Sequence, residues 1–138
     1  IFIKGTDCRY QYLNRSASRF LGRSAEEIVG RDDRELFGEE QAARLLADDR
    51  RVLDRGERCE TEDRLQGTPG TPPRTLLTVK LPLRRPDGTI YALCGISTDI
   101  TERKANEEQL RKLSLAIEQS PNHVLITNVD MVIEYVND

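Results

Sequence analysis

The chain of 138 residues is poor in the residue types that most often form catalytic or metal centres. It has one histidine, three cysteines and no tryptophan, and aromatic residues make up only 5% of it. Cys8, Cys59 and Cys94 are far apart, and the sequence has neither a C-x-x-C pair nor a Cys/His cluster. This pattern indicates neither a zinc site nor a disulfide framework, and it favours a reducing compartment.

The lack of histidine also argues against the common hydrolytic arrangements. His123 stands in a Pro-Asn-His stretch near the end of the chain and is interpreted as a solvated loop residue. No histidine precedes it, so no Ser-His-Asp or Cys-His set can form in the first hundred residues. The glycines fall singly at turns, which is not typical of a phosphate-binding loop. The sequence therefore predicts that this chain is not an enzyme.

Long apolar runs and charge of one sign are missing as well. No run approaches the ~20 apolar residues of a membrane span, and no signal peptide is present. Charged residues make up 33% of the chain, both signs are interleaved, and the net charge is −3. The sequence therefore predicts no nucleic-acid partner, no membrane contact by this chain and a cytoplasmic location. Because the sequence begins at Ile1 and ends within a pattern, it is interpreted as a piece of a longer protein that could carry a membrane anchor elsewhere.

The first half of the sequence predicts a hairpin followed by helices. Residues 1–4 and 9–14 have strand character and are separated by turn residues. Asn14 can cap a helix that ends at Gly22, Ser24 and Glu27 have the spacing of a capping box, and Asp32 can cap a third short helix. Residues 39–56 then show a longer helical period that ends at Gly56.

The second half predicts three strands and a helix. Residues 58–65, 74–85 and 90–100 have strand character, and Leu77, Val79, Leu81 and Leu83 alternate with Thr78, Lys80 and Pro82. Thr101 can cap a polar helix that runs to about residue 120. Because the late strands are joined by turns, they should be antiparallel. The predicted fold is α+β: a five-stranded antiparallel sheet with short helices on one face, followed by a C-terminal helix.

The two ends of the chain resemble each other. When residues 1–15 are placed against residues 124–138 without gaps, identical residues coincide at four positions. This repeat indicates a tandem array whose second copy starts near residue 121. The identical pairs are Ile3 and Ile126, Asp7 and Asp130, Tyr12 and Tyr135, and Asn14 and Asn137.

Several stretches make the chain resemble a PAS domain, a sensory module of bacterial signalling proteins. They are the opening hairpin with "LNRSASRFLGRSAEEIVGR", the "DDRELF" turn before a longer helix, and above all "GISTDITERK". The last is similar to the Asp-Ile-Thr motif with which many PAS domains lead into a helical linker. The resemblance predicts a PAS domain at 1–101, a linker or signalling helix at 102–120 and the truncated start of a second PAS domain at 121–138.

The resemblance also raises the question of a cofactor. Flavin-binding PAS photoreceptors carry a reactive cysteine in an Asn-Cys-Arg-Phe context on a helix, whereas Cys8 in "DCRYQ" falls in the first hairpin turn. Haem-binding members use a histidine in the long-helix region, and this chain has none there. No cofactor is predicted, neither flavin nor haem is expected, and an unidentified small ligand is left open. Another interpretation, a photoreceptor with a bound chromophore, would require the purified protein to absorb visible light.

A small ligand would bind between the sheet and the helices. The same apolar residues are equally well explained as ordinary core, and on periodicity alone the core interpretation is favoured. The candidate pocket residues are Tyr12, Phe20, Leu36, Leu46, Leu53, Val79, Leu81, Cys94 and Ile96.

The exit from the last strand is the candidate joint for signal transmission. Asp99 ends the strand, Thr101 can cap the helix, and Arg103 is placed to pair with Asp99, an interaction worth ~0.2–1 kcal/mol if exposed. Leu110, Leu113 and Ile117 follow at coiled-coil spacing. An isolated helix of this length is marginal in water, so a homodimer through the PAS domain and this helix is predicted.

The resemblance implies a sensory PAS module that detects a small ligand or a partner and signals through its C-terminal helix. The output domain, in the same chain, would be a histidine kinase of a two-component system, or a diguanylate cyclase or phosphodiesterase. The alternative is a structural dimerisation module that binds no ligand. A cavity larger than a water molecule would argue against that alternative.

Overall fold

The structure, a computed structural model, describes residues 1–67 and 69–137. The chain divides into two compact units, residues 1–100 and 101–138, and each is described by itself. The first unit contains β1 (Phe2–Gly5), β2 (Tyr10–Leu13), α1 (Arg15–Leu21), α2 (Ala25–Ile28), α3 (Arg34–Phe37), α4 (Glu39–Arg55), β3 (Cys59–Leu65), β4 (Arg74–Arg84) and β5 (Ile90–Asp99).

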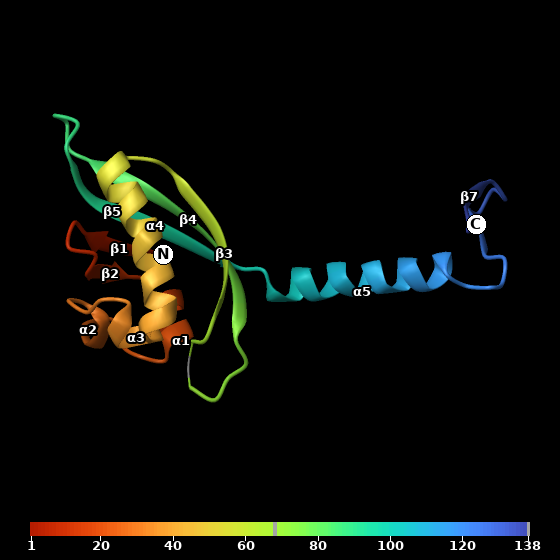
Figure 1. The fold of residues 1–138 in the computed structure, drawn as a ribbon, viewed down its shortest axis with the longest axis horizontal. Helices are drawn as coiled ribbons and strands as arrows, with labels where there is room; N and C mark the ends of the chain where they lie inside the picture. The colour runs from red at the N-terminus through yellow and green to blue at the C-terminus, as the bar shows by residue number, and fades with distance from the viewer. Residues whose placement is uncertain (68, 138) are drawn as a thin grey trace. The chain divides into compact units, whose positions relative to one another are not determined.

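The five strands of the first unit form one antiparallel sheet in the order β2-β1-β5-β4-β3. The central strand, β5, pairs with β1 on one side, where Phe2 faces Gly95, and with β4 on the other, where Lys80 faces Gly95. The helices that connect β2 to β3 lie together against one face of the sheet, with α4 running across it (Figure 1). The predicted α+β fold is confirmed.

Local side-chain caps fix the short helices as the sequence indicates. Asn14 accepts a hydrogen bond from the Ala17 amide, and Ser24 and Glu27 form a complete capping box. Asp32 accepts from the amide nitrogens of Arg34 and Glu35, at 3.0 and 3.3 Å. Because Asp32 performs this role, the neighbouring Asp33 is left to point into the protein, where it is only 4% exposed.

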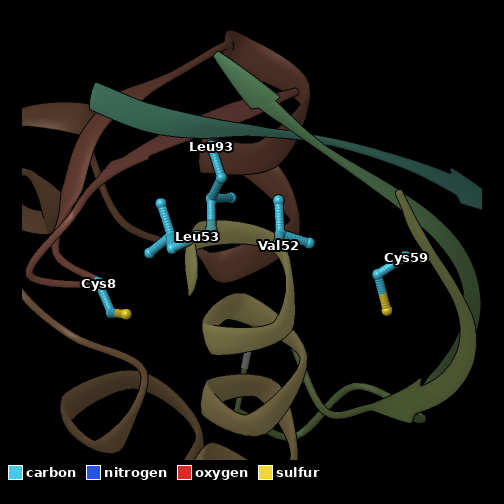
Figure 2. Packing of buried hydrophobic residues seen from close by; sticks show 5 residues of the cluster. All are labelled: Cys8, Val52, Leu53, Cys59 and Leu93. Atoms are coloured by element: carbon cyan, nitrogen blue, oxygen red, sulfur yellow. The ribbon is translucent and has the colours of Figure 1, made fainter. Parts of the chain in front are cut away.

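The core joins α4 to the central strand. Val52 and Leu53 of α4 pack against Leu93 of β5, with Cys8 and Cys59 on either side (Figure 2). Each fully buried aliphatic side chain contributes about 1.5–3 kcal/mol relative to an exposed one. A second cluster, built around Tyr10, Leu13, Leu21 and Ile28, holds α1 and α2 against β2. The two clusters fix the helical layer on the sheet.

The inward face of β4 is not the face that apolar alternation suggests. Leu76, Thr78 and Lys80 are buried beneath the helices. Leu81 on β4 and Ile96 on β5 belong to the opposite face and are 38% and 43% exposed. The side chains of β4 alternate between the two faces of the sheet as predicted, but the apolar side of the strand faces outward. The inward side is polar, and its residues have partners on α4 and β5.

The second unit contains α5 (Thr101–Glu118) and a hairpin of β6 (Leu125–Thr127) and β7 (Ile133–Val136). The helix after the last strand is therefore confirmed. Its apolar residues are not covered within the described part of the chain, since Leu110 is 67% and Leu113 is 53% exposed. No helix among the described residues is both long enough and apolar enough to cross a membrane.

The β6–β7 hairpin has the same geometry as β1–β2. Ile126 faces Tyr135 as Ile3 faces Tyr12, and each hairpin has an irregularity just after this pair. The turns match as well, because the equivalent residues Cys8 and Met131 have φ angles of 61° and 62°.

Candidate functional site

A cavity of about 380 Å³ lies between the inward face of the sheet and the helical layer. This volume is within the range of about 300–1,000 Å³ that is usual for small-molecule sites. Most of its wall is apolar, but polar side chains from β1, β4 and β5 converge at one end. The apolar wall includes Phe2, Leu13, Phe20, Phe37, Leu45 and Leu76.

Two lysines and two aspartates form a buried ionic cluster beside the cavity. The ammonium of Lys4 on β1 lies 2.5 Å from Asp33 and 2.7 Å from Asp49. Lys80 on β4 lies 2.5 Å from the other oxygen of Asp49. None of the four side chains is more than 5% exposed. The charges balance, which is what makes the burial of four ionised groups tolerable.

Further polar contacts complete the ionic cluster. Tyr10 donates its hydroxyl to Asp33 at 2.8 Å, and Lys80 donates to the carbonyl of Leu45 at 3.2 Å. The Lys4 ammonium also lies 4.6 Å from the centre of the Tyr10 ring, in cation–π contact. Asp49 and Leu45 belong to α4, Lys4 to β1 and Lys80 to β4, so the cluster ties the long helix to two strands.

Burial and charge shift the pKa values of two members in the same direction. Burial acts to lower the pKa of Lys4, but the Asp49 and Asp33 carboxylates outweigh it and raise the pKa above its usual value. Burial, assisted by the Asp33 carboxylate, raises the pKa of Tyr10 well above its usual value. Lys4 is therefore held protonated and Tyr10 neutral.

The protein should accordingly lose stability in alkali. Since both folded pKa values exceed the unfolded ones, the stabilisation is complete below about pH 10 and is lost as the pH rises through the folded values. Urea unfolding followed by circular dichroism between pH 8 and 11 measures this decline. We expect Tyr10→Phe to flatten it, whereas Tyr12→Phe, which changes an exposed tyrosine of the same strand, should not. Equal slopes in the natural chain and in Tyr10→Phe would contradict the assignment.

Two further hydroxyl groups line the cavity beside the ionic cluster. They belong to Thr78 and Ser97, which face each other on β4 and β5, and their oxygen atoms are 2.9 Å apart. The mouth of the cavity carries charged groups. Arg74 pairs with Asp99 at 3.0 Å, and both side chains are partly exposed. Arg19, in the last turn of α1, also lines the cavity. The cavity thus has a buried polar end, an apolar body and a charged mouth.

Of the nine pocket residues predicted from the sequence, the structure places Phe20 in the cavity wall. The other eight are corrected. Leu46 and Leu53 pack in the cluster between α4 and β5, and Leu36 packs against the Tyr10 cluster. The remaining residues lie on the outward face of the sheet: Tyr12, Val79, Leu81, Cys94 and Ile96.

Sequence reasoning missed the four charged residues of the ionic cluster. One signal was available, because Asp49 occupies the buried stripe of α4 that also contains Ala42, Leu45 and Val52. A buried aspartate in such a stripe requires a buried cationic partner to offset the loss of its hydration. The sequence could not show that the partners were Lys4 and Lys80, which lie 45 and 31 positions away.

The predicted joint at the end of β5 is partly rearranged. Asp99 pairs with Arg74, and Arg103 lies 3.6 Å from Glu107 on its own helix. Each of the two residues therefore has another ion pair, and an Asp99–Arg103 contact stays a prediction. Thr101 is the first residue of α5, and its role as the cap of this helix stays a prediction.

The cysteines lie where the sequence indicates. Cys8 is in the β1–β2 turn, Cys59 on β3 and Cys94 on β5, and all three are free. Burial raises the pKa of the Cys8 and Cys59 thiols, which makes them weaker nucleophiles at neutral pH. No group of three or more His, Cys, Asp or Glu residues suited to a metal ion is found in the part of the chain that the structure describes.

Comparison with known families decides the identity of the fold. The family model described as "PAS fold" matches residues 1–105. The chain belongs to the PAS family. PAS domains occur in signalling proteins such as sensor histidine kinases, and a sensory-box sensor histidine kinase from Vibrio cholerae has a similar structure. It is 21% identical, with a TM-score of 0.60, and the match covers 72% of this chain and 79% of that chain.

Two other structures of similar fold come from larger proteins. Vibrio cholerae VqmA, described as a LuxR-type receptor, is 23% identical with a TM-score of 0.66; the match covers 74% of this chain and 47% of that chain. An RNA-binding Light-Oxygen-Voltage receptor is 22% identical with a TM-score of 0.67; the match covers 83% of this chain and 33% of that chain. No curated protein matches the sequence.

These two structures correct the expectation of no nucleic-acid partner. VqmA has been solved in complex with a ligand and DNA, and the other receptor is described as RNA-binding. The exclusion was wrong because the balanced charge of one PAS domain describes only its own surface. It does not restrict what a protein that contains such a domain can bind.

Proposed function

We propose that residues 1–100 are a sensory PAS domain that binds a small molecule in the cavity and signals through α5. The observation that carries the proposal is the cavity itself, which is far larger than a water molecule and has polar groups at both ends. A structural module without a ligand has no need of such a space. The fragment itself would do no catalysis, since neither a histidine nor a cysteine is among the described residues that line the cavity, and the carboxylates there, Asp33 and Asp99, are held in ion pairs.

The central strand is suited to report whether the cavity is occupied. Ser97 and Asp99 on β5 line the cavity. Immediately before α5 begins, the amide of Ile100 donates a hydrogen bond to the carbonyl of Thr75 on β4. A ligand that favours one position of β5 would thus bias the start of α5, provided that it binds the two positions unequally. Hydrogen exchange with and without a bound compound tests this. Changes confined to the cavity, with α5 peptides unaffected, would contradict it.

We propose that the active form is a homodimer. Leu110, Leu113 and Ile117 form an apolar stripe on α5, and the outward face of the sheet exposes Tyr12, Leu81 and Ile96. Apolar groups at coiled-coil spacing on a polar helix favour pairing with a second copy.

Substitution of the α5 stripe provides the test. Leu110→Glu with Leu113→Glu should lower the dimer association constant by at least about a hundredfold, because each change places a charge in the apolar seam. Sedimentation equilibrium measures this, with the exposed Gln109→Glu as the control. A natural chain that stays monomeric at high micromolar concentration would rule the dimer out.

We further propose that residues 121–138 begin a second PAS unit. The shared strand register, the shared irregularity and the left-handed residue in each turn support this. The output domain would be a histidine kinase, a diguanylate cyclase or phosphodiesterase, or a nucleic-acid-binding domain like those of the similar receptors. The proposed location is the cytoplasm. We propose that the domain carries no cofactor, neither flavin nor haem.

A further inference from the structure

The charges around the cavity are unevenly distributed. Within the ionic cluster, Lys4 and Lys80 are matched by Asp33 and Asp49. Outside the ionic cluster, the cavity lining contains two guanidinium groups, those of Arg19 and Arg74, and one carboxylate, that of Asp99, which pairs with Arg74. The Arg19 side chain has no ion-pair or hydrogen-bond partner among the residues that the structure describes. The buried end is therefore neutral overall, and the mouth has an excess of positive charge.

We propose that the ligand is a small organic carboxylate with an apolar body and a neutral hydrogen-bond acceptor at its far end. Its carboxylate binds Arg19 and Arg74 at the mouth, and its acceptor binds the buried polar end near Lys80. This inference rests on the proposed ligand-binding function and names the chemical class of the ligand.

The mouth is the favourable place for the negative charge. Guanidinium groups bind carboxylates with paired, charge-assisted hydrogen bonds. Arg74 is 56% exposed, so a carboxylate beside it would keep part of its hydration. A carboxylate pushed into the interior would lose its hydration and add a net charge to a cluster that is already balanced.

The buried end offers hydrogen-bond donors instead. Lys80 has three N–H groups and two acceptors among the described residues, Leu45 and Asp49, and its side chain is 2% exposed. Thr78 and Ser97 share one hydrogen bond, so one of their two hydroxyl hydrogens is left over. A ketone or ether oxygen can accept from these donors without bringing a charge.

The apolar wall of the cavity favours an apolar group in the middle of the ligand. Phe2 and Phe20 face the space together with Leu76 and Leu45. Rings and short aliphatic chains would bury apolar surface here, and their removal from water favours binding. The cavity therefore suits a compact molecule with its charged group at one end, and it disfavours a polyanion.

Three compounds separate these contributions in isothermal titration calorimetry. They are 3-(4-acetylphenyl)propanoate, its neutral amide 3-(4-acetylphenyl)propanamide, and 3-phenylpropanoate, which lacks the acetyl acceptor. We expect the keto acid to bind most tightly. The amide should bind about tenfold more weakly because it lacks the negative charge. 3-Phenylpropanoate should bind several-fold more weakly because it lacks the acetyl acceptor.

Variants assign the two ends. Arg19→Gln and Arg74→Gln should each weaken binding of the keto acid about tenfold and leave the amide unchanged. Thr78→Val should reduce the advantage of the keto acid over 3-phenylpropanoate. Arg58→Gln, which removes an exposed arginine paired with Glu60 outside the cavity, is the matched control. Circular dichroism establishes that each variant is folded.

The outcomes separate this inference from the proposed function. Equal affinity for the acid and the amide, or arginine variants that bind the acid normally, would overturn the carboxylate assignment while ligand sensing stands. Failure of all three compounds to bind at millimolar concentration would also overturn the assignment, and the proposed function would then depend on whether any molecule copurifies with the chain.

Discussion

Replacing Asp49 with alanine is expected to lower the free energy of unfolding by about 3–5 kcal/mol. Asp49 is fully buried and is the common partner of Lys4 and Lys80, which approach its two oxygens at 2.7 and 2.5 Å. Without it, Lys80 would keep only the Leu45 carbonyl among its partners in the described part of the chain. An uncompensated buried ammonium is costly, so urea unfolding should show a large loss, and failure to fold at 25 °C would count as a loss at least this large.

Two further variants make this result specific to the buried charge. Asp54→Ala, which removes an exposed aspartate 3.9 Å from Arg50 on the same helix, should cost less than about 1 kcal/mol. The double variant Asp49→Leu with Lys80→Met leaves the Lys4–Asp33 pair and removes one charge of each sign. It should be clearly more stable than Asp49→Ala. An Asp49→Ala protein within about 1 kcal/mol of the natural chain would show that the ionic cluster contributes little.

Gly95→Ala is expected to destabilise the protein by about 1–3 kcal/mol, although a single methyl group is added. Gly95 lies at the centre of the sheet, between Phe2 of β1 and Lys80 of β4. A Cβ atom placed there would lie 2.0 Å from the Phe2 ring, so the ring would have to move from its place in the cavity wall. Urea unfolding measures the cost, and ligand titration should show weaker binding.

Shortening Phe2 tests the cause. In a Phe2→Leu background the added methyl group meets a smaller side chain, so Gly95→Ala should cost distinctly less than in the natural chain. A double-mutant cycle gives this coupling directly. Full additivity of the two substitutions would contradict the proposed clash.

The parts of the fold that depend on neighbouring residues could be predicted from the sequence. Asn14, Ser24 and Asp32 cap helices because their side chains reach amides two or three residues away, and such contacts can be read from spacing alone. The five-stranded sheet followed from turn-linked strands and from the resemblance of "GISTDITERK" to the exit of PAS domains. The repeat of residues 1–15 at 124–138 appears in the structure as two hairpins of equal register.

The site could not be predicted in the same way, because its chemistry arises from contacts between distant segments. Lys4, Asp33, Asp49 and Lys80 come from two strands, a loop and a helix, and each one alone looks like a solvated charge. Apolar alternation in β4 selects Val79 and Leu81, and that rule assumes that the apolar side of a strand faces the core. Here the ionic cluster takes the inward side, and the apolar residues are left on the outer face. For this reason the predicted pocket residues of the sheet, such as Val79 and Leu81, lie outside the cavity.

Native mass spectrometry of the purified chain tests the central claim most directly, namely that the space between the sheet and the helices binds a small molecule. The natural protein should carry an added mass that is lost on gentle activation, whereas a folded Ala17→Phe variant, with a ring in the cavity wall, should not. A natural chain observed only at its own mass of 15.7 kDa per copy, or an added mass that persists unchanged in Ala17→Phe, would contradict the account.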